Sequence, residues 1–121
     1  MINVKALRAT MEKVELAAKR KGVPNAWNQN VWRSDTGMCF AGHGIALAGL
    51  LWIDPNLSSF DPHVRHPEWG VGFCDDAMVY FYGLTRAESV SLFHVTNTLD
   101  DLRQMVAAIE VIAAMDQEAI L

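Results

Sequence analysis

The chain has 121 residues, of which 51% are hydrophobic and 20% charged, as expected for one globular domain that builds its own core. The net charge of −4 excludes a nucleic-acid binder that works through bulk positive charge. Two cysteines are too few for a disulfide framework, and the sequence shows neither a secretory signal nor a membrane span. We therefore expect a cytoplasmic protein with no membrane contact.

The charges are unevenly distributed along the chain. Residues 1–33 carry a net charge of +5, and residues 34–121 carry a net charge of −9. This asymmetry fits either a basic first helix packed against an acidic remainder or a basic arm for an anionic partner. We favour the first interpretation, because Glu15 and Lys19 have the spacing of a stabilising pair on a solvated helix face.

The N-terminal segment predicts a helix over residues 3–21. Its apolar residues recur at spacings of three and four, and Asn3 is a suitable N-cap. A glycine and a proline follow and end it. Residues 25–37 have no clear period, and we expect a short helical turn there that anchors Trp27 and Trp32.

Residues 38–53 (MCFAGHGIALAGLLWI) form the most apolar stretch of the chain. The stretch is too short to span a membrane, so it predicts a buried central helix, with two short strands as the alternative. Its small residues, Gly44 among them, would let neighbouring helices approach closely. We expect it to pack on the last helix, with Ala46, Leu47 and Leu50 against Leu99, Leu102 and Val106.

A long loop rich in proline is predicted over residues 54–72, and helix signals follow it. Asp75 or Asp76 can cap a short helix that Gly83 ends, and Thr85 with Glu88 and Thr98 with Asp101 mark the starts of the next two helices. The last of these helices is expected to end near Met115. The sequence therefore predicts a mainly α fold, a single domain over residues 1–121 with five or six helices around the central helix.

Cys39 is a candidate nucleophile, because the segment Gly37-Met-Cys39-Phe-Ala is locally like the thiol segment of papain-like proteases. A helix N-terminus also lowers the pKa of a thiol. The base would come from His63, His66 or His94, and Asn97 would orient it. Such proteases take these partners from a β domain, for which this chain shows little strand signal. We therefore interpret Cys39 as a packed core residue and predict no catalytic residue.

Metal and nucleotide motifs are incomplete. The patterns Cys39-x₃-His43 and His63-x₂-His66 contain zinc-ligand residue types, but their spacing matches no zinc finger. The glycines near Cys39 have P-loop spacing and lack the lysine and the Ser/Thr that bind phosphate and magnesium. We predict no metal and no cofactor.

Several short motifs occur in a fixed order. They are Trp27-x-Gln29-x-x-Trp32-Arg33, Gly37-x-Cys39-Phe-Ala-Gly42-His43, Gly83-Leu84-Thr85 and Asn97-Thr98-Leu99-Asp-Asp101-Leu102. In this pattern the chain resembles small uncharacterised accessory proteins of actinobacterial phages and prophages, over about residues 25–110. The resemblance implies a phage accessory protein that acts in the host cytoplasm, and it gives this setting without a mechanism or an activity.

These observations predict a non-enzymatic protein that binds a host or phage macromolecule. The alternatives are a small-ligand-binding or sequestering module with a polar pocket near His43, and a cysteine- or zinc-dependent enzyme. We expect the 54–72 loop to form part of the partner- or ligand-binding surface, because large aromatic side chains in an irregular segment are typical of interface anchors. Its apolar contacts would be Phe60 and Trp69, and its acidic rim Asp54, Asp61 and Glu68. The acidic rim favours a basic protein partner over nucleic acid. The sequence is also compatible with a homo-oligomer.

Overall fold

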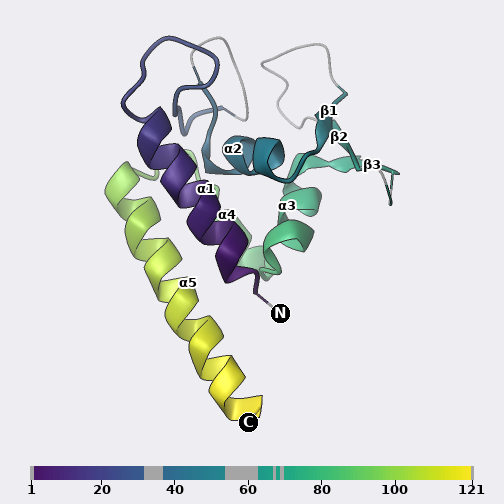
Figure 1. Ribbon diagram of the computed structural model, residues 1–121, viewed down its shortest axis with the longest axis vertical. Coiled ribbons are helices and arrows are strands. Elements are labelled where there is room, and N and C mark those ends of the chain that lie inside the picture. The colour runs from purple at the N-terminus through teal and green to yellow at the C-terminus, as the bar shows by residue number, and fades with distance from the viewer. Residues whose placement is uncertain (1, 32–36, 54–62, 67, 69, 121) are drawn as a thin grey trace.

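The computed structural model describes residues 2–31, 37–53, 63–66, 68 and 70–120, and for residues 116–120 the main chain alone. These ranges contain five helices and a three-stranded antiparallel sheet (Figure 1). The elements in chain order are α1 (Val4–Ala17), α2 (Phe40–Leu47), β1 (Leu51–Trp52), β2 (His63–His66), β3 (Gly70–Phe73), α3 (Cys74–Tyr82), α4 (Arg86–Leu92) and α5 (Leu99–Ile120). The mainly α fold predicted from the sequence is therefore wrong, because the domain mixes helices with a sheet.

The sheet arises where the sequence predicts a helix end and a loop. The helix predicted over residues 38–53 is only α2, which is followed by Gly49 with a left-handed φ of +71°. The chain then continues as β1. The 54–72 segment, predicted as one loop, contains all of β2 and the start of β3. A short apolar run does not distinguish a strand from a buried helix. For this reason the apolar pattern of residues 38–53 predicts a helix at the positions where β1 forms.

Helix α1 is the centre of the helical packing. It packs against both α2 and α5, and its stripe of Leu7, Val14 and Ala17 is completely buried. The predicted packing of the central helix on the last helix is wrong, because α1 takes that place and Ala46 and Leu47 are exposed. Of the other predicted contact positions, Leu50, Leu102 and Val106 are buried and Leu99 is half-buried.

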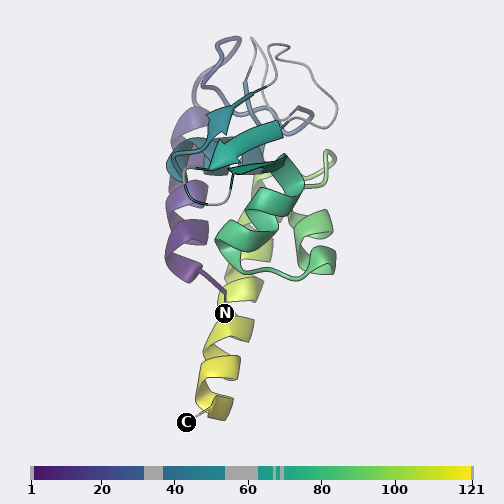
Figure 2. The same cartoon turned by 90° about the vertical axis from the view of Figure 1, so that its right-hand side faces the viewer.

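Helices α1 and α5 run antiparallel, and both views show α5 extending past α1 towards the C-terminus (Figures 1 and 2). Two ion pairs link them. Arg8 Nε lies 2.8 Å from Glu110 Oε1, and Arg103 Nε lies 2.6 Å from Glu15 Oε1. These pairs show the register of the two helices, with the start of α5 beside the end of α1.

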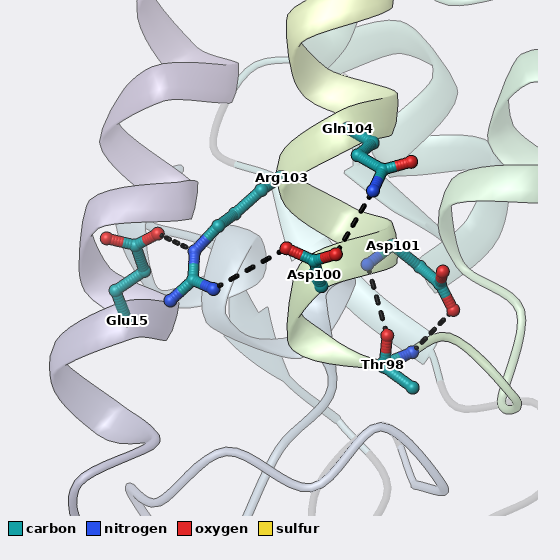
Figure 3. A network of polar contacts seen from close by, with 6 residues as sticks. All are labelled: Glu15, Thr98, Asp100, Asp101, Arg103 and Gln104. Carbon is teal, nitrogen blue, oxygen red and sulfur yellow. Dashed lines mark hydrogen bonds and ion pairs between the residues drawn. The ribbon is translucent and has the colours of Figure 1, made fainter.

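The helix starts follow the predicted capping residues. The Asn3 side chain accepts a hydrogen bond from Ala6 N, and Thr85 and Glu88 form a complete capping box. Thr98 Oγ1 accepts from Asp101 N (3.1 Å), and the Asp101 carboxylate accepts from Thr98 N (2.9 Å) (Figure 3). These three predictions are confirmed. At α3 the predicted aspartate cap is wrong, because Phe73 occupies the N-cap position and forms no side-chain cap.

Two of the interactions drawn in Figure 3, the Arg103–Glu15 ion pair and the Thr98 cap, should differ in their contribution to stability. The Arg103–Glu15 pair is exposed on both sides, so Arg103→Met should change the free energy of unfolding by less than about 0.5 kcal/mol. Thr98→Ala leaves helical N–H groups without an acceptor and should cost about 1 kcal/mol. Denaturant unfolding of both variants checks this order. A larger loss for Arg103→Met would mean that the ion pair matters more than the cap.

Candidate functional site

The sheet has one face in the core. Its strands lie in the order β1-β2-β3, and the register aligns Trp52, Val64 and Gly72 in one row. Val64 is completely buried, so this row faces inwards. Neighbouring rows point to the opposite face, because side chains alternate along a strand.

The outer face of the sheet is apolar. One row consists of Leu51, Arg65 and Val71, and the next contains His63 and Phe73, extended by Ile53. We call these six residues the outer sheet face. The exposed fractions of its apolar side chains are 65% for Leu51, 56% for Val71, 42% for Phe73 and 41% for Ile53. An antiparallel sheet with one buried face normally presents polar residues on the other, so this cluster indicates an interaction surface.

A single cation lies within this face. Arg65 is exposed and stands between Leu51 and Val71 in its row. In the part of the chain that the structure describes, Arg65 forms no ion pair, whereas Arg8, Arg86 and Arg103 each lie beside a carboxylate. An exposed guanidinium with apolar neighbours suits a partner that carries a carboxylate among apolar residues.

Strand β3 forms an edge of the sheet. Ile53 N donates to His63 O (3.1 Å), so the main-chain groups of His63 point towards β1. The N–H and C=O groups of successive residues point to opposite sides of a strand, so those of Val64 point towards β3 and pair with Gly72. The N–H and C=O groups of Val71, the residue before Gly72, therefore point away from β2. The main chain at Val71 is therefore oriented to pair with a further strand.

A hollow lies beside this edge. It has a volume of about 340 Å³ and is lined by Gly72, Asp76, Ala77 and Tyr80. A second hollow of about 210 Å³ shares Ala77 and Tyr80 and reaches His66. Tyr80 is 77% exposed, and tyrosine is a residue type enriched at binding hot spots. The outer sheet face, the β3 edge and these hollows form one candidate docking surface.

The structure places the predicted site residues unevenly. Phe60, Asp61 and Trp69, like Asp54, lie outside the described residues, so their assignment to a binding surface stays a prediction. Glu68 is exposed in the turn between β2 and β3, where its N–H donates to His66 Nδ1 (3.0 Å).

His43 lies in the core. Its side chain is completely buried on α2, and its Nε2 lies 3.0 Å from Ala26 O. Among the described residues its Nδ1 has no hydrogen-bond partner. Burial lowers the pKa of His43, as do the nearby charges of Lys13 and Arg20, so the imidazole is neutral at physiological pH. This position does not fit a surface pocket for a ligand.

Cys39 is also buried, as expected of a packed core residue. Its Sγ accepts a hydrogen bond from Gly42 N (3.4 Å), but burial raises the pKa of the thiol to about 11. The desolvation penalty therefore outweighs the effect of the helix N-terminus, and the group stays a thiol at neutral pH. The described ranges contain no cluster of three or more His, Cys, Asp or Glu side chains that could hold a metal ion.

The apolar residues of the outer sheet face were missed by the sequence reasoning. A weak signal was present, because Gly70-Val-Gly-Phe73 alternates with the period of a strand. Leu51 and Ile53 gave no comparable signal, since they end the most apolar run of the chain. Their exposure depends on pairing with β2, which no local pattern reports.

Comparison with protein-family models, with curated proteins and with solved structures found no match. The described helices include none that combines the length and apolar character of a membrane span.

Proposed function

We propose that the chain is a non-enzymatic protein-binding module that docks an extended segment of a partner protein on its outer sheet face and β3 edge. The observation that carries this proposal is the exposure of four apolar side chains on a sheet whose opposite face belongs to the core. Leaving such a face in water forgoes about 25 cal/mol for each Å² of apolar surface that could be buried. A partner that covers the face recovers this free energy.

Addition of a strand is the binding mode that uses every feature of the surface. A partner strand beside β3 would pair its main chain with Val71. Its side chains on one side would lie against Val71 and Phe73, and those on the other side would enter the hollow at Gly72 and Tyr80. Main-chain pairing supplies affinity in this mode, and the side-chain contacts supply selectivity.

The charge of the surface favours a carboxylate on the partner. Arg65 has no ion pair within the described residues, so an aspartate or glutamate of the partner can bind it without displacing another acid. The basic partner expected from the sequence depends on Asp54, Asp61 and Glu68, of which only Glu68 is described. We therefore propose a partner segment with apolar residues around one acidic residue.

The resemblance to phage accessory proteins supplies the setting for this proposal. In that setting the partner is a host or phage protein met in the host cytoplasm. Buried Cys39 and His43 agree with a non-enzymatic role, because neither is accessible to a substrate.

Selection from a displayed library of random peptides tests the docking surface. We expect the recovered peptides to bind as strands and to combine apolar residues with an aspartate or glutamate. Val71→Asp should weaken their binding by about tenfold or more, because a charge would be buried against apolar side chains. Val90→Asp is the matched control, since Val90 is 59% exposed on α4, away from the sheet.

Arg65→Glu provides a second comparison. It should weaken the binding of peptides that carry an acidic residue and leave the affinity of peptides without one nearly unchanged. Equal binding to the native chain and to Val71→Asp would remove the outer sheet face from the site. Recovery of helical peptides alone would contradict strand addition.

A further inference from the structure

A polar hollow at the C-terminal end of α1 shares no residue with the outer sheet face. It has a volume of about 350 Å³ and opens to solvent between the end of α1, the segment around residue 28 and the turn after α4. The lining residues used below are Arg20, Lys21, Trp27, Gln29, Asn30 and Asn97. Small-ligand sites typically have volumes of about 300–1,000 Å³ and a few convergent polar groups.

We propose that this hollow binds a nucleotide, with the phosphate at Arg20 and Lys21 and the base against Trp27. The proposal is independent of protein docking at the sheet. It also develops the second interpretation of the charge asymmetry, in which the basic N-terminal region meets an anionic partner.

The two cations are available to an anion. Arg20 and Lys21 are exposed, and neither forms an ion pair within the described ranges. Burial lowers the pKa values of Lys13 and His43, and the positive charge of Arg20 adds to the lowering of both. The C-terminal dipole of α1 offsets only about half an elementary charge. The hollow therefore keeps a net positive potential.

The floor of the hollow is held rigidly by Gln29. The Gln29 Oε1 atom accepts from Trp27 Nε1 (3.1 Å) and from Phe40 N (3.0 Å). Its Nε2 donates to His94 O (3.1 Å) and to Leu92 O (3.4 Å). The three other bonds anchor Gln29, and its bond to Trp27 Nε1 holds the indole in place before a ligand arrives, which reduces the entropy lost on binding.

Amide groups complete the polar lining. Asn97 is buried, and its Nδ2 donates to Ser91 O (2.7 Å) and Leu92 O (3.0 Å), which holds its side chain at the edge of the hollow. Asn30 is exposed, and its side-chain amide forms no hydrogen bond within the described residues. The Asn30 amide can therefore donate to and accept from the edge of a base, whereas both Nδ2 hydrogens of Asn97 are already used.

The combination of these groups favours a nucleotide over a bare anion. Guanidinium and ammonium groups bind phosphate, and an indole provides a planar surface on which a base can stack. Inorganic phosphate would use the cations alone and leave Trp27 and the amides without a role. This site does not need the glycine-rich loop of a P-loop, because side chains rather than main-chain N–H groups would hold the phosphate.

Titration with adenosine monophosphate, followed by NMR of the Trp27 indole N–H and by calorimetry, tests the proposal. We expect the Trp27 signal to shift at millimolar nucleotide. Lys21→Glu should raise the Kd by about tenfold, because it replaces an attraction for the phosphate by a repulsion. Lys5→Glu is the matched control, because it makes the same change of charge at an exposed α1 position outside the hollow. It should change the Kd by less than about twofold.

Adenosine and inorganic phosphate serve as partial ligands in the same titration, and each should bind more weakly than the nucleotide. Phosphate that binds as tightly as the nucleotide would overturn the base contact with Trp27. Equal losses of nucleotide affinity for Lys21→Glu and Lys5→Glu would show that the nucleotide is attracted by the overall charge of the protein and does not bind at this hollow. Absence of any shift at millimolar nucleotide would overturn the proposal, as would a short single-stranded oligonucleotide that binds far more tightly.

Discussion

Replacing Leu102 with alanine should lower the free energy of unfolding by about 2–5 kcal/mol. Leu102 is completely buried on α5, and Val106 and Ile109 continue the buried stripe along the same helix. This stripe faces α1, to which α5 is also joined by the Arg8–Glu110 ion pair. Truncation to alanine leaves a cavity between two helices whose other contacts hold them in place. Urea unfolding followed by circular dichroism measures the loss.

Leu47→Ala is the matched control for Leu102→Ala. The sequence placed both leucines in one interface, but Leu47 is 43% exposed at the end of α2. The control should therefore cost less than about 1 kcal/mol, since little apolar surface is lost from the core. Similar losses for the two variants would mean that α2 packs on α5 as the sequence predicts, and that the arrangement around α1 is wrong.

The helix starts could be predicted from the sequence because capping is local. Asn3, Thr85 and Thr98 each accept from an N–H three residues ahead, so the necessary partners lie within one turn. The apolar stripe of α1 was equally visible, since it repeats at helical period over four turns. Which helix that stripe contacts was not visible, because several helices present a stripe of similar width.

The strands could not be predicted, because their stability comes from pairing between distant segments. Strand β1 has only two residues, and its partners in β2 are Val64 and Arg65, more than ten positions away. Strand β1 is too short to show an alternation, and in β2 the alternation of His63, Val64 and Arg65 covers only three residues. The outward side chains of β1 and β3 are apolar, so a pattern rule that expects one polar face does not detect these strands.

The candidate docking surface overlaps in part with the segment that the sequence predicts. Residues 54–72 contain Arg65 and Val71 of the outer sheet face. The prediction for this segment depends on Phe60 and Trp69, whose roles stay predictions. Leu51 and Phe73 lie just outside the segment, and only the sheet register brings them beside Arg65 and His63.

The small residues of the 38–53 stretch were predicted to allow close helix approach, and Gly44 shows how. It lies on α2 against α3, where an added Cβ would overlap the Tyr82 hydroxyl and lie 3.1 Å from Met78 Sδ. Tyr82 cannot easily move aside. Its ring is completely buried, with the Phe40 and Phe81 ring centroids at 5.8 and 5.0 Å, and its hydroxyl lies 2.8 Å from Thr10 Oγ1.

Gly44→Ala should therefore destabilise the domain, even though alanine is the better helix former. The gain in helix propensity is about 1 kcal/mol. Insertion of a methyl group into a packed core costs about 1–3 kcal/mol or more, and direct overlap with a fixed hydroxyl belongs at the upper end. We expect a net loss of about 2 kcal/mol in the free energy of unfolding.

Tyr82→Phe supplies the test of this cause. The Thr10 hydroxyl donates to Ala6 O (2.8 Å), so the Tyr82 hydroxyl is the donor to Thr10. Its removal from the native chain should cost about 1 kcal/mol, the usual value of one hydrogen bond. In the Gly44→Ala background the same change also removes the overlap, so it should be neutral or stabilising. Unfolding of the native chain, the two single variants and the double variant gives a coupling of about 1–2 kcal/mol if the hydroxyl causes the strain. Additive losses would place the effect of Gly44→Ala elsewhere in the α2–α3 contact, where the new methyl group also meets Met78 Sδ and the Tyr82 ring carbon Cζ, each at 3.1 Å.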